Sequence, residues 1–188
     1  KMNTHLYYSV KVTDSKGKTL KKFTRKSRSY LTAYNELLSG IMMVDWTETI
    51  TDTGNTARSA AHTTYMMATR GAVNVSLWGI VIGTGSTAVT ISDYKLATQI
   101  NEGTGSGQMT HADSTRTASA VVGSTASFTI TRIITNSSGA SILVAECGIY
   151  ARYSTTWYFC IIRDVLSSSV NVPNGGAITI VYTMKATV

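Results

Sequence analysis

The sequence predicts an all-β protein, mainly an antiparallel β-sandwich, with one short helix near the N-terminus. Charged residues make up 14% of the 188 residues, whereas Ser, Thr and 15 glycines supply much of the remaining polar share. Such a composition favours short strands and tight turns over solvated helices, which usually carry many Lys and Glu. The clearest pattern consists of four apolar-rich segments broken by turn residues: Phe128–Ile134, Ile142–Arg152, Trp157–Leu166 and Ala177–Thr187.

The length of the chain fits one domain with an appendage and is sufficient to bury a sizeable core. The pattern changes along the chain, and we therefore expect three parts. They are a basic β-hairpin plus helix over residues 1–44, an extended arm or loop over 45–76, and an antiparallel β-sandwich over 77–188.

The N-terminal part begins with an alternating pattern that predicts a half-buried strand over residues 6–13. Side chains of a strand point alternately to its two faces. One face would therefore carry the apolar residues Leu6, Tyr8, Val10 and Val12. The turn residues Asp14–Gly17 and the segment Thr19–Lys26 that follows predict the return strand of a hairpin.

From Ser29 onward the period becomes helical. Five apolar or aromatic residues fall on one helix face, namely Tyr30, Tyr34, Leu37, Leu38 and Ile41. We expect a helix over about residues 29–43, with Ser29 as its N-cap. Residues 45–72 have no clear period, and a connection this long is usually functional or held by a neighbour.

The body begins with Leu77–Ile82, a short apolar run that predicts a strand buried on both faces. The next residues, Gly83–Ala88, match the dinucleotide fingerprint G-x-G-x-x-G/A. That motif binds a pyrophosphate only where a helix begins. The continuation Val89–Ile91 is β-like, so we interpret the glycines as a turn that ends the strand and expect no cofactor.

The segments around Tyr153 and Ser154 predict a second hairpin. A turn centred on these residues would place Cys147 opposite Cys160 and Tyr150 opposite Trp157. We favour two free buried thiols over a disulfide, because the chain shows no export signal.

Glu146 and Arg163 carry charge inside apolar segments, and this hairpin would put them on one face. We interpret them as a partly buried salt bridge that fixes the strand register, in preference to a catalytic carboxylate.

No arrangement of residues predicts a reaction, and we expect the protein not to be an enzyme. The three histidines, His5, His62 and His111, lie far apart, and the sequence has no H-x-x-x-H or C-x-x-C spacing. We therefore expect neither a metal nor a catalytic residue. The sequence also has no apolar stretch long enough to span a membrane, and no secretory segment follows Lys1.

The net charge of +7 lies almost entirely in residues 1–28, which hold nine of the 17 basic residues and one acid, Asp14. The candidate contact residues for another subunit or a polyanion are Lys21, Lys22, Arg25, Lys26 and Arg28. Three interpretations stay open: an edge strand that faces solvent or a subunit, contact with nucleic-acid phosphates, or contact with an acidic cell-surface glycan. The near-neutral body favours burial against copies of the same chain.

The last third also carries recurring sequence patterns. They are Glu146-x-Gly148-Ile149-Tyr150, Ile162-Arg163-Asp164-Val165-Leu166, Val170-x-Val172-Pro173-x-Gly175 and Ile178-Thr179-Ile180-x-Tyr182-Thr183. They are preceded by Ile80-Val81-Ile82-Gly83-Thr84-Gly85 and Tyr94-x-Leu96-x-Thr98-x-Ile100. Together these patterns resemble a module common in tailed-bacteriophage virion proteins, over about residues 77–188.

The resemblance implies a non-enzymatic β-sandwich subunit that is present in many copies on a phage head or tail, and it assigns no catalytic or binding residue. We therefore expect a structural subunit of a virion: a capsid-surface, connector or tail component that self-assembles and contacts other virion proteins. The alternative is a subunit of an extracellular cellular filament or adhesin, which an export signal upstream of Lys1 would favour. A nucleic-acid-binding module is a third class, and it predicts salt-dependent DNA binding.

Overall fold

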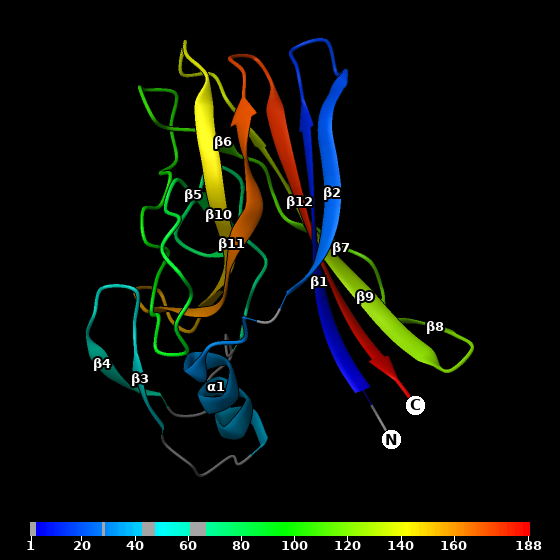
Figure 1. Cartoon of the computed structure of the whole chain (residues 1–188). Helices are drawn as coiled ribbons and strands as arrows, with labels where there is room; N and C mark the ends of the chain where they lie inside the picture. The colour runs from blue at the N-terminus through cyan, green and yellow to red at the C-terminus, as the bar shows by residue number, and fades with distance from the viewer. Residues whose placement is uncertain (1–2, 28, 43–47, 61–66) are drawn as a thin grey trace.

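The computed structural model describes residues 3–27, 29–42, 48–60 and 67–188. Strands make up 53% of the chain, their sheets are antiparallel, and one short helix lies near the N-terminus. The predicted fold class is confirmed. The described residues form two sheets that face each other, with the helix and a small hairpin at one end (Figure 1).

The larger sheet contains seven strands. Its main path runs β2-β1-β12-β9-β6, and β7 and β8 also pair with β9. The bounds are β1 (Asn3–Thr13), β2 (Thr19–Ser27), β6 (Thr110–His111), β7 (Thr115–Arg116), β8 (Ala120–Val122), β9 (Thr125–Thr135) and β12 (Ala177–Thr187).

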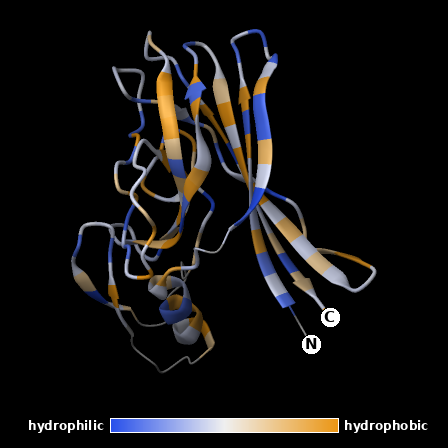
Figure 2. Ribbon diagram, viewed as in Figure 1, coloured by the Kyte–Doolittle hydropathy of each residue, from blue (hydrophilic) through white to orange (hydrophobic). Residues whose placement is uncertain are grey.

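The smaller sheet has the order β11-β10-β5, with bounds β5 (Gly79–Gly83), β10 (Ile142–Arg152) and β11 (Tyr158–Val172). Its inner face meets the larger sheet in a shared core that includes Val10, Ile180 and Ile149. Its outer face is buried as well, because Tyr150 and Val81 pack there under the loop residue Leu96. Burial on both faces explains the nearly continuous apolar runs of these strands (Figure 2).

The N-terminal hairpin belongs to the larger sheet and is not a separate element. β1 pairs with β12 along its full 11 residues, from Asn3 opposite Thr187 to Thr13 opposite Ala177. The apolar face predicted for β1 continues the inner face of β12, which explains the pairing. Strand pairing therefore crosses the expected division at residue 77.

Helix α1 (Thr32–Met42) begins three residues later than the predicted start at Ser29. The residues before it extend the sheet: Tyr30 bridges to Ile162, and the Leu31 amide donates to the Ile161 carbonyl. This pairing holds residues 29–31 extended, so Ser29 does not cap the helix.

The segment expected to be an arm contains a small hairpin of β3 (Glu48–Thr51) and β4 (Ala57–Ala60). Asp52 organises its turn, because one carboxylate oxygen accepts from the amides of Gly54 and Thr56 and the other pairs with Arg58 at 2.6 Å. Residues 43–47 and 61–66 lie outside the described part of the chain.

The predicted register of the β10–β11 hairpin is wrong. Cys147 lies opposite Asp164, and Tyr150 lies opposite Cys160. The turn is wider than expected, because the strands close where the Tyr153 amide donates to the Trp157 carbonyl at 3.0 Å. Both cysteines are free and buried, as predicted.

One end of the larger sheet extends beyond the smaller sheet. In Figure 1, β1, β12, β9 and β8 run together past the lower end of β10 and β11, and both chain termini lie there. We call this part the projecting end: residues 3–7, 120–130 and 183–188. Its inner face continues the face that elsewhere forms the core.

Candidate interaction surfaces

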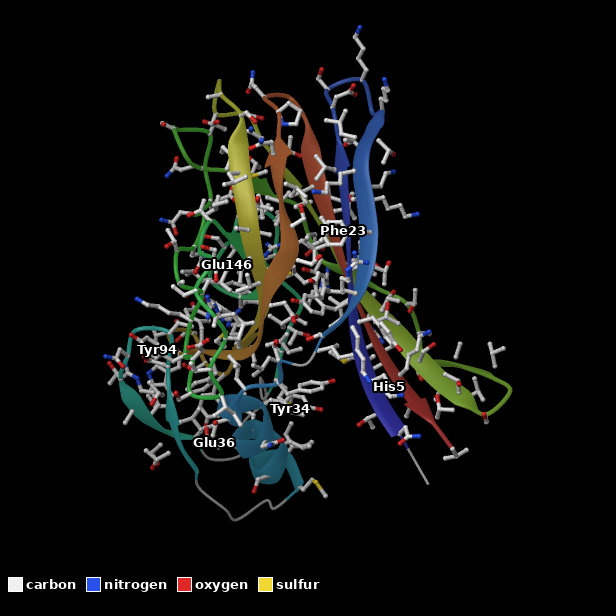
Figure 3. All side chains as sticks on the ribbon, viewed as in Figure 1. His5, Phe23, Tyr34, Glu36, Tyr94 and Glu146 are labelled. Atoms are coloured by element: carbon white, nitrogen blue, oxygen red, sulfur yellow. The ribbon has the colours of Figure 1, made fainter. Side chains whose placement is uncertain are left out.

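The buried charges of the protein hold loops in place. Glu146 is fully buried in β10, and its carboxylate accepts hydrogen bonds from the backbone amides of Gly85, Ala97 and Thr98 (Figure 3). It also pairs with the Arg163 guanidinium, Nε to Oε2, at 2.9 Å. The predicted salt bridge is therefore confirmed, and it binds the loop over residues 84–98 to the smaller sheet.

Gly148 and Tyr150 complete this arrangement. The Tyr150 hydroxyl accepts from the Leu96 amide at 2.6 Å. Between Glu146 and Tyr150, a Cβ on Gly148 would lie 2.4 Å from the Ile162 carbonyl oxygen and 3.1 Å from a Leu96 methyl carbon. The pattern Glu-x-Gly-Ile-Tyr thus has a structural explanation: two side chains hold the loop, and the glycine leaves room for it.

Arg132 has a comparable role in the larger sheet. Its buried guanidinium donates to the backbone carbonyls of residues in two loops and β5: Ala72, Val75, Trp78, Ile80 and Ala112. Burial lowers the pKa of Arg132 to about 10, so the group stays charged at neutral pH. The arginine therefore fastens the loops that lead into and follow β5.

Asp164 forms a third buried polar cluster, between the sheets. The Tyr182 hydroxyl donates to its carboxylate at 3.0 Å and lies 3.3 Å from the Cys147 sulfur. Burial raises the pKa of Asp164 above its ordinary value and raises the pKa of Tyr182 further.

The histidines do not come together. His111 lies against Glu102, with Nδ1 2.8 Å from a carboxylate oxygen, and His5 lies on the projecting end (Figure 3). His62 is outside the described residues. Within the described ranges, no group of three or more His, Cys, Asp or Glu side chains could hold a metal ion. None of the described helices is both long and apolar enough to cross a bilayer.

The predicted contact residues lie on the edge strand β2, but they point to two sides. Lys21 and Arg25 flank Phe23 on the inner side, where Lys21 Nζ donates to the Ser168 hydroxyl at 2.7 Å. Lys22 and Lys26 lie on the outer side, opposite Lys11 and Tyr7 of β1. Arg28 lies outside the described residues. The run is therefore not a single charged surface.

The sequence analysis did not identify the apolar inner face of the projecting end. Leu6 of β1 lies opposite Met184, Met184 lies opposite Phe128, and Val121 extends the same face through its pairing with Ala126. Val121 is 73% exposed. The alternation of β9 and β12 predicts which residues share a face, but no local pattern shows where the covering sheet ends.

A cavity of about 570 Å³ adjoins this face. Phe128 and Ile130 supply its apolar lining, and the polar lining includes Arg116 together with Arg70 and Asp113, which pair at 2.7 Å. An apolar centre beside charged residues of both signs is typical of a surface that binds another protein.

Comparison with protein-family models gives no match, and comparisons with curated proteins and with solved structures give none either. The functional argument therefore depends on the residues and surfaces described above.

Proposed function

We propose that this chain is a non-enzymatic structural subunit of a bacteriophage particle and acts through self-assembly. It would serve as a capsid-surface, connector or tail component, in contact with copies of itself and with other virion proteins. The observation that carries the proposal is the apolar inner face of the projecting end, which extends the core face beyond the smaller sheet.

The chemistry of this face favours another protein as its cover. Met184 and Phe128 are only partly buried, and Val121 is 73% exposed. Each large apolar side chain contributes about 1.5–3 kcal/mol when it moves fully from water into an apolar contact. Burial of several such side chains between subunits would therefore favour association.

A second copy of the chain is the occupant that fits best. The polar lining of the cavity contains both an acid, Asp113, and bases, Arg70 and Arg116, so two copies can place opposite charges against each other. Repeated contacts of one kind build closed rings or extended arrays, which are the forms that virion subunits take. The likeness of residues 77–188 to phage virion proteins also supports this proposal.

The substitution Val121→Glu tests the proposal, because it places a charge on the proposed interface at a position with little fold-stabilising contact. We expect the wild-type chain to associate in sedimentation velocity and the variant to remain smaller at the same concentration. Val73→Glu is the matched control, since Val73 is 60% exposed in a loop away from this face. Equal association of all three proteins, or equal loss in both variants, would contradict the proposal.

A further inference from the structure

The outer, solvent-facing side of the larger sheet is a separate surface. Side chains that point away from the core form rows across β2, β1, β12 and β9. From β2 to β9 the rows are Lys22, Lys11, Thr179, Ile133, then Thr24, Ser9, Val181, Thr131, then Lys26, Tyr7, Thr183, Thr129, and a final row of His5, Lys185, Ser127. We call this surface the outer face.

The outer face carries positive charge and no negative charge. None of the four strand sequences contains Asp or Glu. Lys11 and Lys22 lie directly opposite each other, and Lys185 lies opposite another basic side chain, His5. Like charges in such cross-strand pairs destabilise a sheet unless something neutralises them.

The described part of the chain supplies no neutralising group. Lys11, Lys22 and Lys26 are exposed, and no hydrogen bond or ion pair joins their ammonium groups to a described residue. Lys185 lies over the Tyr7 ring, with Nζ 5.4 Å from its centroid. The charges of the outer face are therefore available to an anionic partner.

We propose that the outer face binds the phosphate backbone of double-stranded nucleic acid without reading its sequence. Lysine ammonium groups and the hydroxyls of Ser, Thr and Tyr are the groups that contact phosphate and sugar oxygens. The face is a broad sheet surface, with no helix or projecting ribbon that could enter a groove and read bases. Tyr7 is its one aromatic residue in the rows above, which favours a duplex over stacked single-stranded bases.

The dimensions of the surface suit a duplex. From the row of Lys11 to the row of His5 the face extends roughly 20 Å along the strands, at about 3.3 Å per residue. Double-stranded DNA carries one charge per about 1.7 Å of its axis, so this length spans about twelve phosphates. All four lysines can therefore contact phosphates of one duplex segment.

This surface differs from the basic run predicted from the sequence. Lys21 and Arg25 belong to the same strand but point to its inner side, so they lie outside the outer face. Lys11 and Lys185 join Lys22 and Lys26 because β1 pairs with both β2 and β12. The proposal concerns a different surface from the projecting apolar face and does not depend on self-assembly.

Fluorescence anisotropy with a duplex of mixed sequence, measured over a series of salt concentrations, tests the proposal. For four phosphate contacts we expect the slope of log K against log salt concentration to be about −3.6, and little dependence on base sequence. In Lys22→Gln/Lys26→Gln the slope should become less steep by about 2. Lys21→Gln/Arg25→Gln is the matched control, because it removes the same charge from the opposite side of the same strand, and it should retain the wild-type slope.

Three results would overturn the proposal: no duplex binding at low salt, an equal loss of slope in the two double variants, or binding to an anionic polysaccharide without binding to the duplex. Circular dichroism verifies that each variant is folded. The Val121→Glu variant should bind the duplex as the wild type does. This last comparison separates a failure of nucleic-acid binding from a failure of self-assembly.

Discussion

Glu146 illustrates how single residues stabilise this protein, because a buried carboxylate holds a loop that has no regular structure of its own. In Glu146→Ala, the amides of Gly85, Ala97 and Thr98 and the Arg163 guanidinium lose their acceptor. We expect the free energy of unfolding to fall by about 3–5 kcal/mol, the usual cost of removing one partner from a buried pair. Urea denaturation measures this change.

Asp93→Ala provides the comparison for Glu146→Ala. Asp93 pairs with the same guanidinium at 2.6 Å, but its side chain is 20% exposed and water can replace it in part. A loss of stability in Asp93→Ala as large as that in Glu146→Ala would contradict the central role of Glu146.

Asp164 makes the stability of the protein depend on pH. Burial raises the pKa of its carboxyl in the folded protein above the value in the unfolded chain, which is about 3.9. The folded state is therefore favoured most below about pH 4, and this contribution is lost as the pH rises through the folded-state pKa.

Asp164→Asn removes this titration. We expect the stability of the variant, relative to the wild type, to increase from pH 4 to pH 8, because the wild type alone must then hold a buried charge. Urea midpoints at several pH values measure the difference between the two proteins. A difference that is constant with pH would show that Asp164 ionises as easily in the folded protein as in the unfolded chain.

At the scale of elements, Arg132 joins two loops to the larger sheet through its five backbone acceptors. In Arg132→Lys the compact ammonium cannot reach all of them, and each buried carbonyl left without a donor costs about 1–3 kcal/mol. We expect a loss of at least about 2 kcal/mol and faster amide hydrogen exchange in residues 72–80 and 112–114.

Arg116→Lys is the matched control for Arg132→Lys. Arg116 lies on the neighbouring strand β7 and is exposed, so its replacement should change the stability by less than about 0.5 kcal/mol. Unchanged exchange in residues 72–80 of Arg132→Lys would show that these loops are held by other contacts.

The strands and the helix could be predicted from local periodicity, since Leu6 to Val12 alternate and Tyr34, Leu37 and Ile41 recur at helical spacing. The register of β10 and β11 could not. It depends on the width of one turn, where Ser154 accepts hydrogen bonds from the amides of Thr156 and Trp157. A shift of a few residues in that turn separates Cys147 from Cys160, although each strand is correctly identified.

At the scale of the whole molecule, both proposed surfaces arise from pairings between distant parts of the chain. Lys185 reaches the row below Lys26 only because β12 lies beside β1, and Phe128 is left partly exposed only because the smaller sheet ends above it. Local pattern shows which residues share the face of one strand. It does not show which strands are neighbours, and for this reason the sequence analysis located the basic charge on β2 alone.

The size of the purified full chain as a function of concentration tests the central proposal most directly. We expect sedimentation velocity to show larger species as the concentration rises, and negative-stain microscopy of the same samples to show rings or filaments of repeated subunits. A single monomeric species across the whole concentration range, with isolated particles in the micrographs, would contradict an account in which the projecting end joins copies of this chain.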